Sequence, residues 1–204
     1  MVIRQELIVN NRPGGKINPT TVTVHNTANP NTTAQNNRDY FSNHPNAKVS
    51  THWVVDDKEA IKCVPEYEPT WHAGPAANYS SISIEVCEFT DSKRQEKCND
   101  NAAQLVADIL TRYKWNIDKV TTHQNWTGKY CPRKLLPMWD QFVNMVKQYL
   151  PKDVLMQSLE VLRDNKIISS FDYWLANARP DQLCKGDFVA SLIIKMAAKL
   201  KGGI

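Results

Sequence analysis

The chain has 204 residues, 42% of them hydrophobic, and a formal net charge of +4 from 25 basic and 21 acidic residues. This length fits one hydrophobic core of about 150 residues together with a small annex. No run approaches the roughly 18 consecutive apolar residues of a membrane-spanning helix, and the charge is not gathered into the basic stripe of a nucleic-acid-binding protein. Composition therefore indicates a protein with no membrane insertion and no nucleic-acid partner.

Residues 1–9 are apolar but are interrupted by Arg4, Gln5 and Glu6. They show neither the basic start nor the continuous apolar run of a secretory signal, so we expect synthesis in the cytoplasm without a signal peptide. The five cysteines are odd in number and irregular in spacing. A disulfide framework is therefore not expected, and a small buried side chain is the default interpretation of each cysteine.

Strand patterns dominate the first half of the chain. Residues 21–24 alternate polar and apolar side chains and predict a strand that ends at His25. A helix is expected over 34–43, and two short β-rich runs, 51–56 and 60–64, indicate a hairpin. Residues 81–89 form the clearest strand pattern, which places Glu85 on its polar face.

Helical periodicity dominates the second half. Apolar residues recur at helical spacing from Asp100 to Trp115, with Asn99 or Asp100 as the expected N-cap, and again from Trp139 to Leu150. Strands interleaved with helices predict an α/β sheet domain over residues 1–150.

Residues 151–204 are predicted to form a small all-helical C-terminal module. Helical spacing of leucines extends to Asn165, and a second amphipathic run extends from Phe188 to Leu200, with an aromatic cluster at 171–175 between them. About fifty residues of helix bury little apolar surface alone. We therefore expect this module to pack on the first domain, on itself in a homodimer, or on a partner.

The segment 121–132 carries the clearest chemistry. His123 and Cys131 lie eight positions apart on a loop closed by Pro132, where they can converge on one point. Imidazole and thiolate are good ligands for Zn²⁺, and two His with one Cys leave a fourth position for water. His25, at the end of the strand 21–24, is the candidate for the third ligand. From its position alone, His25 is better explained as a hydrogen-bonded polar residue at a strand end, but together with the segment 121–132 a metal ligand is favoured.

Five blocks in register carry a family resemblance: 24–27, 50–56, 71–74, 81–85 and 122–132. Over about residues 1–150 the chain resembles the zinc-dependent N-acetylmuramoyl-L-alanine amidases of the type-2 amidase and peptidoglycan-recognition superfamily, above all phage endolysins and Bacillus or Clostridium autolysins. The resemblance implies a central mixed β-sheet flanked by helices and a zinc ion in a groove. It also implies hydrolysis of the amide between N-acetylmuramic acid and L-alanine in peptidoglycan.

By motif position, the resemblance implies that His25, His123 and Cys131 bind the zinc. Some relatives carry Asp at the third position, and members that only recognise peptidoglycan often lack a third ligand, so Cys131 favours an enzyme. The resemblance further implies that Glu85 is the general base and that Lys129 stabilises the oxyanion. The alternatives are an ion-paired glutamate at the edge of the core and a solvated loop lysine.

The substrate groove is expected to include several polar and aromatic residues: Asn26, Trp71, His72, Trp126 and Thr127. His72 matches a position that contacts glycan or peptide in several relatives, and His52 is expected to support the site from the adjacent strand. Tryptophan suits stacking on sugar faces, but each of these tryptophans is equally well explained as part of the core.

Two other functions stay open at this point: a peptidoglycan-binding module without activity, and a cytosolic amidase that recycles muropeptides. For an endolysin or autolysin we expect action at the bacterial cell wall after holin- or lysis-dependent release. By analogy with wall-lytic enzymes, the C-terminal module is expected to bind the wall, with a stabilising or dimerising appendage as the alternative.

Overall fold

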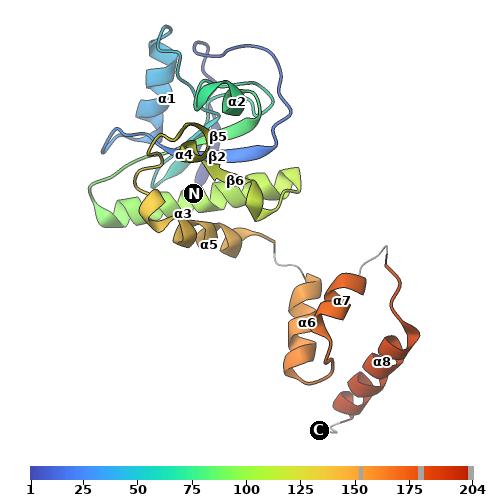
Figure 1. Ribbon diagram of the computed structural model, residues 1–204. Coiled ribbons are helices and arrows are strands. Elements are labelled where there is room, and N and C mark those ends of the chain that lie inside the picture. Colours follow the sequence, from blue (N-terminus) through green and yellow to red (C-terminus); the bar gives the residue numbers. More distant parts are fainter. Residues whose placement is uncertain (152–153, 179–181, 202–204) are drawn as a thin grey trace. The chain divides into compact units, whose positions relative to one another are not determined.

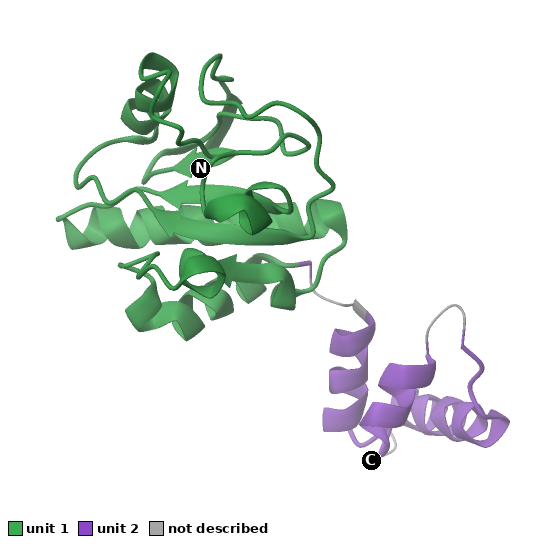
Figure 2. Ribbon diagram, turned by 45° about the horizontal axis from the view of Figure 1, so that its top comes forward, with its two compact units in different colours: residues 1–150 green, residues 151–204 purple. Residues whose placement is uncertain are grey.

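The computed structural model describes residues 1–151, 154–178 and 182–201 of the chain. Its contacts divide the chain into two compact units, Met1–Leu150 and Pro151–Ile204, which Figure 2 shows in separate colours. None of the described helices has the length and apolar character needed to cross a membrane.

A six-stranded sheet in the order β1-β4-β3-β5-β2-β6 forms the centre of the first unit. Its strands are β1 (Val2–Gln5), β2 (Thr21–Asn26), β3 (Trp53–Val55), β4 (Glu59–Lys62), β5 (Ser81–Val86) and β6 (Val120–Thr122). The β3–β4 pair is antiparallel, as expected for the hairpin, whereas the other described pairs are parallel. The mixed sheet confirms the predicted fold class.

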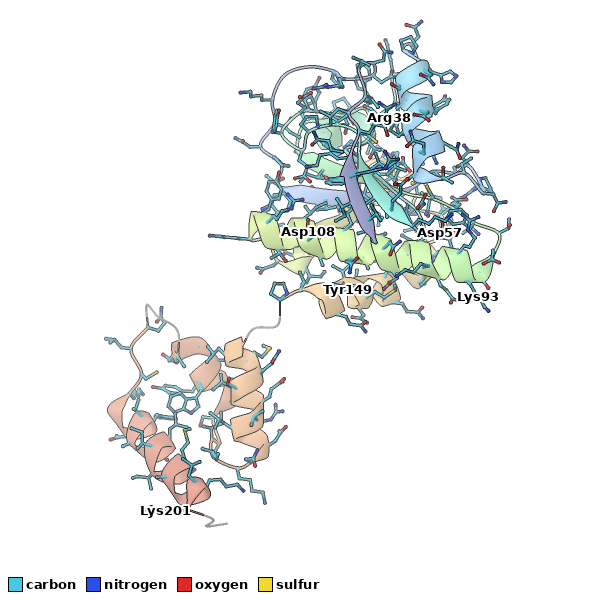
Figure 3. All side chains as sticks on the ribbon, turned by 180° about the vertical axis from the view of Figure 1, so that it is seen from behind. Arg38, Asp57, Lys93, Asp108, Tyr149 and Lys201 are labelled. Carbon is cyan, nitrogen blue, oxygen red and sulfur yellow. The ribbon has the colours of Figure 1, made fainter. Side chains whose placement is uncertain are left out.

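Helices cover the sheet on both sides (Figure 1). Helix α1 (Ala34–Asn43) packs on β3 and β4, and the long α3 (Ser92–Tyr113) packs on β3, β4 and β5. Helix α5 (Trp139–Tyr149) lies against α3, and the Tyr149 hydroxyl donates a hydrogen bond to Asp100 of α3 (Figure 3). The short helices α2 (Gly74–Asn78) and α4 (His123–Thr127) contact each other, and two 3₁₀ turns occupy Ile117–Lys119 and Leu136–Met138.

The register of β2 against β5 gives the sheet two chemically different faces. Val22 and Val24 of β2 lie beside Ile82 and Ile84 of β5, and all four side chains are fully buried. The alternate positions carry polar side chains, with Thr23 beside Ser83 and His25 beside Glu85. Because adjacent residues of neighbouring strands point to the same side of a sheet, His25 and Glu85 share the polar face.

Three sequence-based expectations need correction. The N-cap prediction at Asn99 or Asp100 is wrong, because α3 begins at Ser92 and its N-cap Asp91 accepts a hydrogen bond from the backbone N–H of Arg94 at 2.8 Å. The first two turns of α3 are largely polar and therefore show no apolar periodicity. Strand β2 continues to Asn26, so His25 lies within the strand rather than after it. The strands β1 and β6 and the helices α2 and α4 were not predicted, because elements of three to five residues are too short for a periodic signal. Helix α4 places His123 on a helix, where a loop over 121–132 was expected.

The second unit contains α6 (Val154–Asp164), α7 (Phe171–Asn177) and α8 (Gly186–Leu200). A small apolar core of Leu159, Ile168 and Trp174 holds them together, and the ring of Tyr173 stacks on that of Phe188 at 3.9 Å. The helical character expected for this region is confirmed, and its aromatic cluster belongs to α7.

Candidate metal centre

The three predicted ligands meet at one point of the polar sheet face. The Nδ1 atom of His25 lies 3.1 Å from Nδ1 of His123 and 3.8 Å from Sγ of Cys131. The three donor atoms lie within 4.8 Å of one another, and all three residues are buried. Two imidazole nitrogens and one sulfur that point at a common centre form a candidate metal site.

The chain reverses after helix α4, and this reversal places Cys131 close to His123, the first residue of that helix. Thr122 and Asn125 cap this short helix at its N-terminus, and Gly128 ends it in the left-handed region with φ 79°. The chain then reverses, and the backbone carbonyl of Cys131 accepts a hydrogen bond from the N–H of Gln124 at 3.0 Å. A β-carbon at Gly128 would strain this left-handed conformation, so glycine suits the reversal.

The buried side chain of Asn26 ties the Cys131 segment to the sheet. Its amide nitrogen donates to the Val86 carbonyl at 3.1 Å, and its amide oxygen accepts from the N–H of Lys134 at 2.9 Å. Asn26 was predicted to line the substrate groove, but both ends of its amide have protein partners. Its structural contribution is to hold β2, β5 and the segment after Cys131 together.

Burial sets the protonation of the three donors. It lowers the pKa of His25 far below the usual value, and it lowers the pKa of His123, so both rings are neutral and keep a lone pair. Burial also raises the pKa of the Cys131 thiol to about 11. A thiolate at this position requires a nearby cation, and a metal ion held by the two imidazoles would supply that charge.

Glu85 lies beside His25 and has a buried oxygen, Oε2, without a hydrogen-bond partner among the described residues. Burial raises the pKa of Glu85 to about 8, against the opposing charge of Lys129. A carboxyl group held this way takes up and returns protons near neutral pH. Lys129 itself is exposed, and its charge also lowers the pKa of His123.

Glu85 lines a cavity of about 310 Å³ beside α1. The other lining residues are Thr27, Asn29, Asn37, Tyr40, Phe41 and Val49. The hydroxyl of Thr27 is also buried without a partner in the described part of the chain. The sequence-based site contained none of these six residues. Thr27 lies in the block 24–27 but was given no role, and the other five residues lie outside the five blocks.

The remaining predicted residues have varied surroundings. His72 contacts the second nitrogen of His25, since its Nδ1 lies 3.0 Å from Nε2 of His25. The indole N–H of Trp126 donates to Thr23 of β2 at 2.8 Å, and Thr127 lies close to Gly74. Trp71 is half-buried, and its backbone pairs with Ser50.

His52 lies in a buried hydrogen-bond network away from the three donor atoms. One ring nitrogen contacts the Ser83 hydroxyl at 2.9 Å, and the other lies 2.8 Å from the Glu68 carbonyl. These contacts join the residue before β3 to Ser83 of β5, and His52 is not one of the three donors that converge.

Comparison with known proteins agrees with this geometry. Residues 15–134, more than half of the chain, match the family N-acetylmuramoyl-L-alanine amidase. The chain belongs to this family. The matched range includes the three metal-donor candidates, Glu85 and Lys129, whereas residues 151–204 lie outside it.

Curated relatives show the same relationship. The N-acetylmuramoyl-L-alanine amidase XlyA of Bacillus subtilis (strain 168) is 40% identical over 138 residues, which are 65% of this chain and 46% of XlyA. CwlH of the same organism is 39% identical over 139 residues, 66% of this chain and 55% of CwlH. The matches thus span about half the length of these relatives.

Solved structures confirm the fold of the first unit. The catalytic domain of XlyA superposes with a TM-score of 0.67 at 38% identity and covers 72% of this chain and 99% of that domain. PlyL superposes with a TM-score of 0.66 at 35% identity and covers 72% of this chain and 97% of PlyL.

Proposed function

We propose that the chain hydrolyses the amide between N-acetylmuramic acid and L-alanine in peptidoglycan and acts at the bacterial cell wall. The observation that carries this proposal is the convergence of His25, His123 and Cys131 beside Glu85, whose unpartnered oxygen lies at a cavity. The names of the relatives XlyA and CwlH give the bond that such a site cleaves.

Zinc is the metal that we propose for the three donors. In a tetrahedral zinc site, bonds of about 2.0–2.1 Å to nitrogen and 2.3 Å to sulfur put two nitrogens about 3.3 Å apart and nitrogen about 3.6 Å from sulfur. Here Nδ1 of His25 lies 3.1 Å from Nδ1 of His123 and 3.8 Å from Sγ of Cys131, and all three donor atoms lie within 4.8 Å of one another. The mixed imidazole and thiolate set suits zinc better than it suits magnesium or calcium, which prefer oxygen ligands.

When bound, zinc supplies Lewis-acid chemistry that polarises the scissile carbonyl and makes water a better nucleophile. Glu85 accepts the proton of the attacking water and returns it to the leaving amine of L-alanine. Lys129 places an ammonium charge near the oxygen that becomes negative as the amide is attacked. Trp71, Trp126 and Thr127 remain our proposals for the groove wall, to which the cavity adds Tyr40 and Thr27.

The decisive experiment is digestion of purified sacculi with the zinc-loaded protein, followed by mass spectrometry of the products. We expect new N-terminal L-alanine, and no such terminus with Glu85→Gln. Binding to sacculi without a new terminus would instead identify a peptidoglycan-binding protein. Cleavage of soluble muropeptides alone would identify a recycling amidase.

We further propose that residues 151–204 hold the enzyme on the wall. A cavity of about 210 Å³ lies in this unit, and its lining includes the aromatic residues Trp174 and Phe188 and the charged residues Asp187 and Lys195. Aromatic rings beside charged groups suit a ligand with both sugar faces and ionised peptide groups. The cavity is the observation that favours this role.

Filling this cavity tests the wall-binding role in the full chain. Ser191→Trp should reduce co-sedimentation with sacculi and leave cleavage of soluble fragments unchanged, because Ser191 lines the cavity. Ala190→Trp, at an exposed neighbouring position, is the matched control. Equal sedimentation of all three proteins would contradict the proposal.

A homodimer through this unit is the alternative. Helix α8 exposes Ile193, Ile194 and Leu200, which are 62%, 68% and 86% accessible. Light scattering of the wild type and of Ile194→Glu measures self-association, and a dimer that Ile194→Glu dissociates would favour this role.

A further inference from the structure

Both nitrogens of the His25 ring have partners, which is the starting point for the inference. Nδ1 faces His123 and Cys131, whereas Nε2 lies 3.0 Å from Nδ1 of His72. The rings of His25 and His72 are nearly perpendicular, with an interplanar angle of 87° and centroids 5.1 Å apart. This edge-on arrangement directs an N–H bond of one ring at the lone pair of the other.

The direction of this hydrogen bond follows from the chemistry of a ligating imidazole. A metal bound at Nδ1 of His25 uses the lone pair of that nitrogen, so the ring proton resides on Nε2. Nε2–H of His25 then donates, and Nδ1 of His72 accepts. His72 in turn keeps its own proton on Nε2, an atom that is buried and has no hydrogen-bond partner in the described ranges.

The scaffold, rather than a substrate, holds His72 in place. The backbone N–H groups of His72 and Ala73 both donate to the side-chain oxygen of Asn78, at 2.8 Å and 3.0 Å. Asn78 is buried at the end of α2. These bonds fix the backbone from which the His72 ring extends to His25, and they do not depend on a substrate.

We infer that His72 is a positioning residue: it accepts the Nε2–H of His25 and orients the His25 ring so that Nδ1 faces the metal. The inference rests on the metal site proposed above and replaces the expected contact of His72 with substrate. Acceptors behind a ligating histidine are commonly carboxylates or carbonyls. A neutral imidazole performs the same orientation without adding negative charge beside the ion and Glu85.

Metal affinity of full-length variants tests this role without any substrate. His72→Leu removes the acceptor, and we expect zinc affinity, measured by competition with a chromophoric chelator, to fall by about 10–100-fold. His72→Asn places a carbonyl oxygen near the position of Nδ1 and should retain an affinity close to that of the wild type. His44→Leu is the matched control, because His44 is exposed on the surface.

Thermal unfolding of the metal-free proteins separates positioning from mere packing. The inference requires that His72→Leu lose zinc affinity while its metal-free melting temperature stays near that of His72→Asn. Wild-type zinc affinity in His72→Leu would overturn it, as would equal losses of affinity and of metal-free stability in both variants. If the wild type binds zinc but releases no N-terminal L-alanine from sacculi, the proposed function fails and this inference is unaffected.

Discussion

The two faces of the β2–β5 pair are equally buried but contain opposite kinds of side chain. On one face Val24 and Ile84 are fully buried among other apolar groups, and on the other Ser83 is fully buried and His25 is 2% exposed. Burial of apolar area stabilises the first face, at roughly 25 cal/mol per Å². Burial of polar groups costs stability unless every group has a partner.

The polar face meets this requirement almost everywhere, and its exceptions are informative. Ser83 bonds Thr51 and His52, and Thr23 bonds Ser81 and Trp126. Three buried side-chain oxygens lack a partner in the described structure: Asn101 Oδ1 lies on α3, whereas Glu85 Oε2 and Thr27 Oγ1 belong to two residues that line one cavity. The proposed general base is therefore a buried carboxyl group whose second oxygen no described protein group satisfies.

The largest effect is expected from Cys131→Ser on the polar face. A serine hydroxyl does not ionise to replace the thiolate, so zinc affinity should fall by more than the roughly 10–100-fold that an outer-shell change costs. Metal analysis after dialysis and L-alanine release from sacculi measure the two losses. Cys184→Ser, in the second unit, should match the wild type in both. A zinc-loaded, active Cys131→Ser protein would contradict the assignment of this ligand.

Glu85→Gln separates proton transfer from metal binding. The amide keeps the size of the side chain but cannot accept a proton, so kcat should fall by about 10²- to 10⁴-fold with zinc content unchanged. Initial rates of L-alanine release and metal analysis of the same samples give both quantities. Glu96→Gln, at an exposed position of α3, should leave the rate unchanged. An unaltered rate in Glu85→Gln would remove Glu85 from the mechanism.

The sequence predicted which residues gather on the polar face better than it predicted the hydrogen bonds among them. The motif order selected His25, His123, Cys131 and Glu85, and the structure brings these residues together because parallel register aligns β2 with β5. The hydrogen bond from His25 to His72 could not be predicted, since it depends on which ring nitrogen faces which neighbour 47 positions away. The two hydrogen bonds of the Asn26 amide could not be predicted either, because their partners, Val86 and Lys134, are distant in the sequence.

Fold prediction failed where a helix cap or a strand pairing, rather than apolar periodicity, defines an element. The start of α3 depends on the Asp91 cap and on polar turns, so the apolar pattern placed it eight residues late, at Asp100 instead of Ser92. Strand β6 has three residues and exists because it pairs with β2. The apolar face, by contrast, was readable from the alternation of residues 81–86.

Shortening a side chain on the apolar face should lower the stability of the fold and leave zinc binding unchanged. Ile84→Ala removes a fully buried side chain and should lower the free energy of unfolding by about 2–5 kcal/mol. Urea denaturation followed by tryptophan fluorescence measures this change. Val9→Ala, which truncates an 82% exposed side chain of the same unit, should stay within about 0.5 kcal/mol of the wild type. Loss of zinc from folded Ile84→Ala would show that the two faces are not separable.

The smallest expected effect is a pH dependence of the unfolding free energy. It should come from the polar face alone and is measured after the metal has been removed. Burial raises the pKa of Glu85 to about 8 in the folded chain, above its ordinary value of 4.5. Between these values the folded state binds a proton that the unfolded state does not, so this group's contribution to stability falls as pH rises, by at most about 1.4 kcal/mol per pH unit.

Glu85→Gln isolates this contribution from the neighbouring histidines, whose lowered pKa values act in the opposite direction at lower pH. In chelator-treated samples, the unfolding free energy of the wild type minus that of Glu85→Gln should decline by about 1–3 kcal/mol from pH 5 to pH 8. The same difference for Glu96→Gln should be flat, because Glu96 is exposed. A difference that does not change with pH for Glu85→Gln would mean that the pKa of Glu85 is not raised in the folded protein. Water would then reach the carboxyl group, and the buried environment proposed for the general base would be wrong.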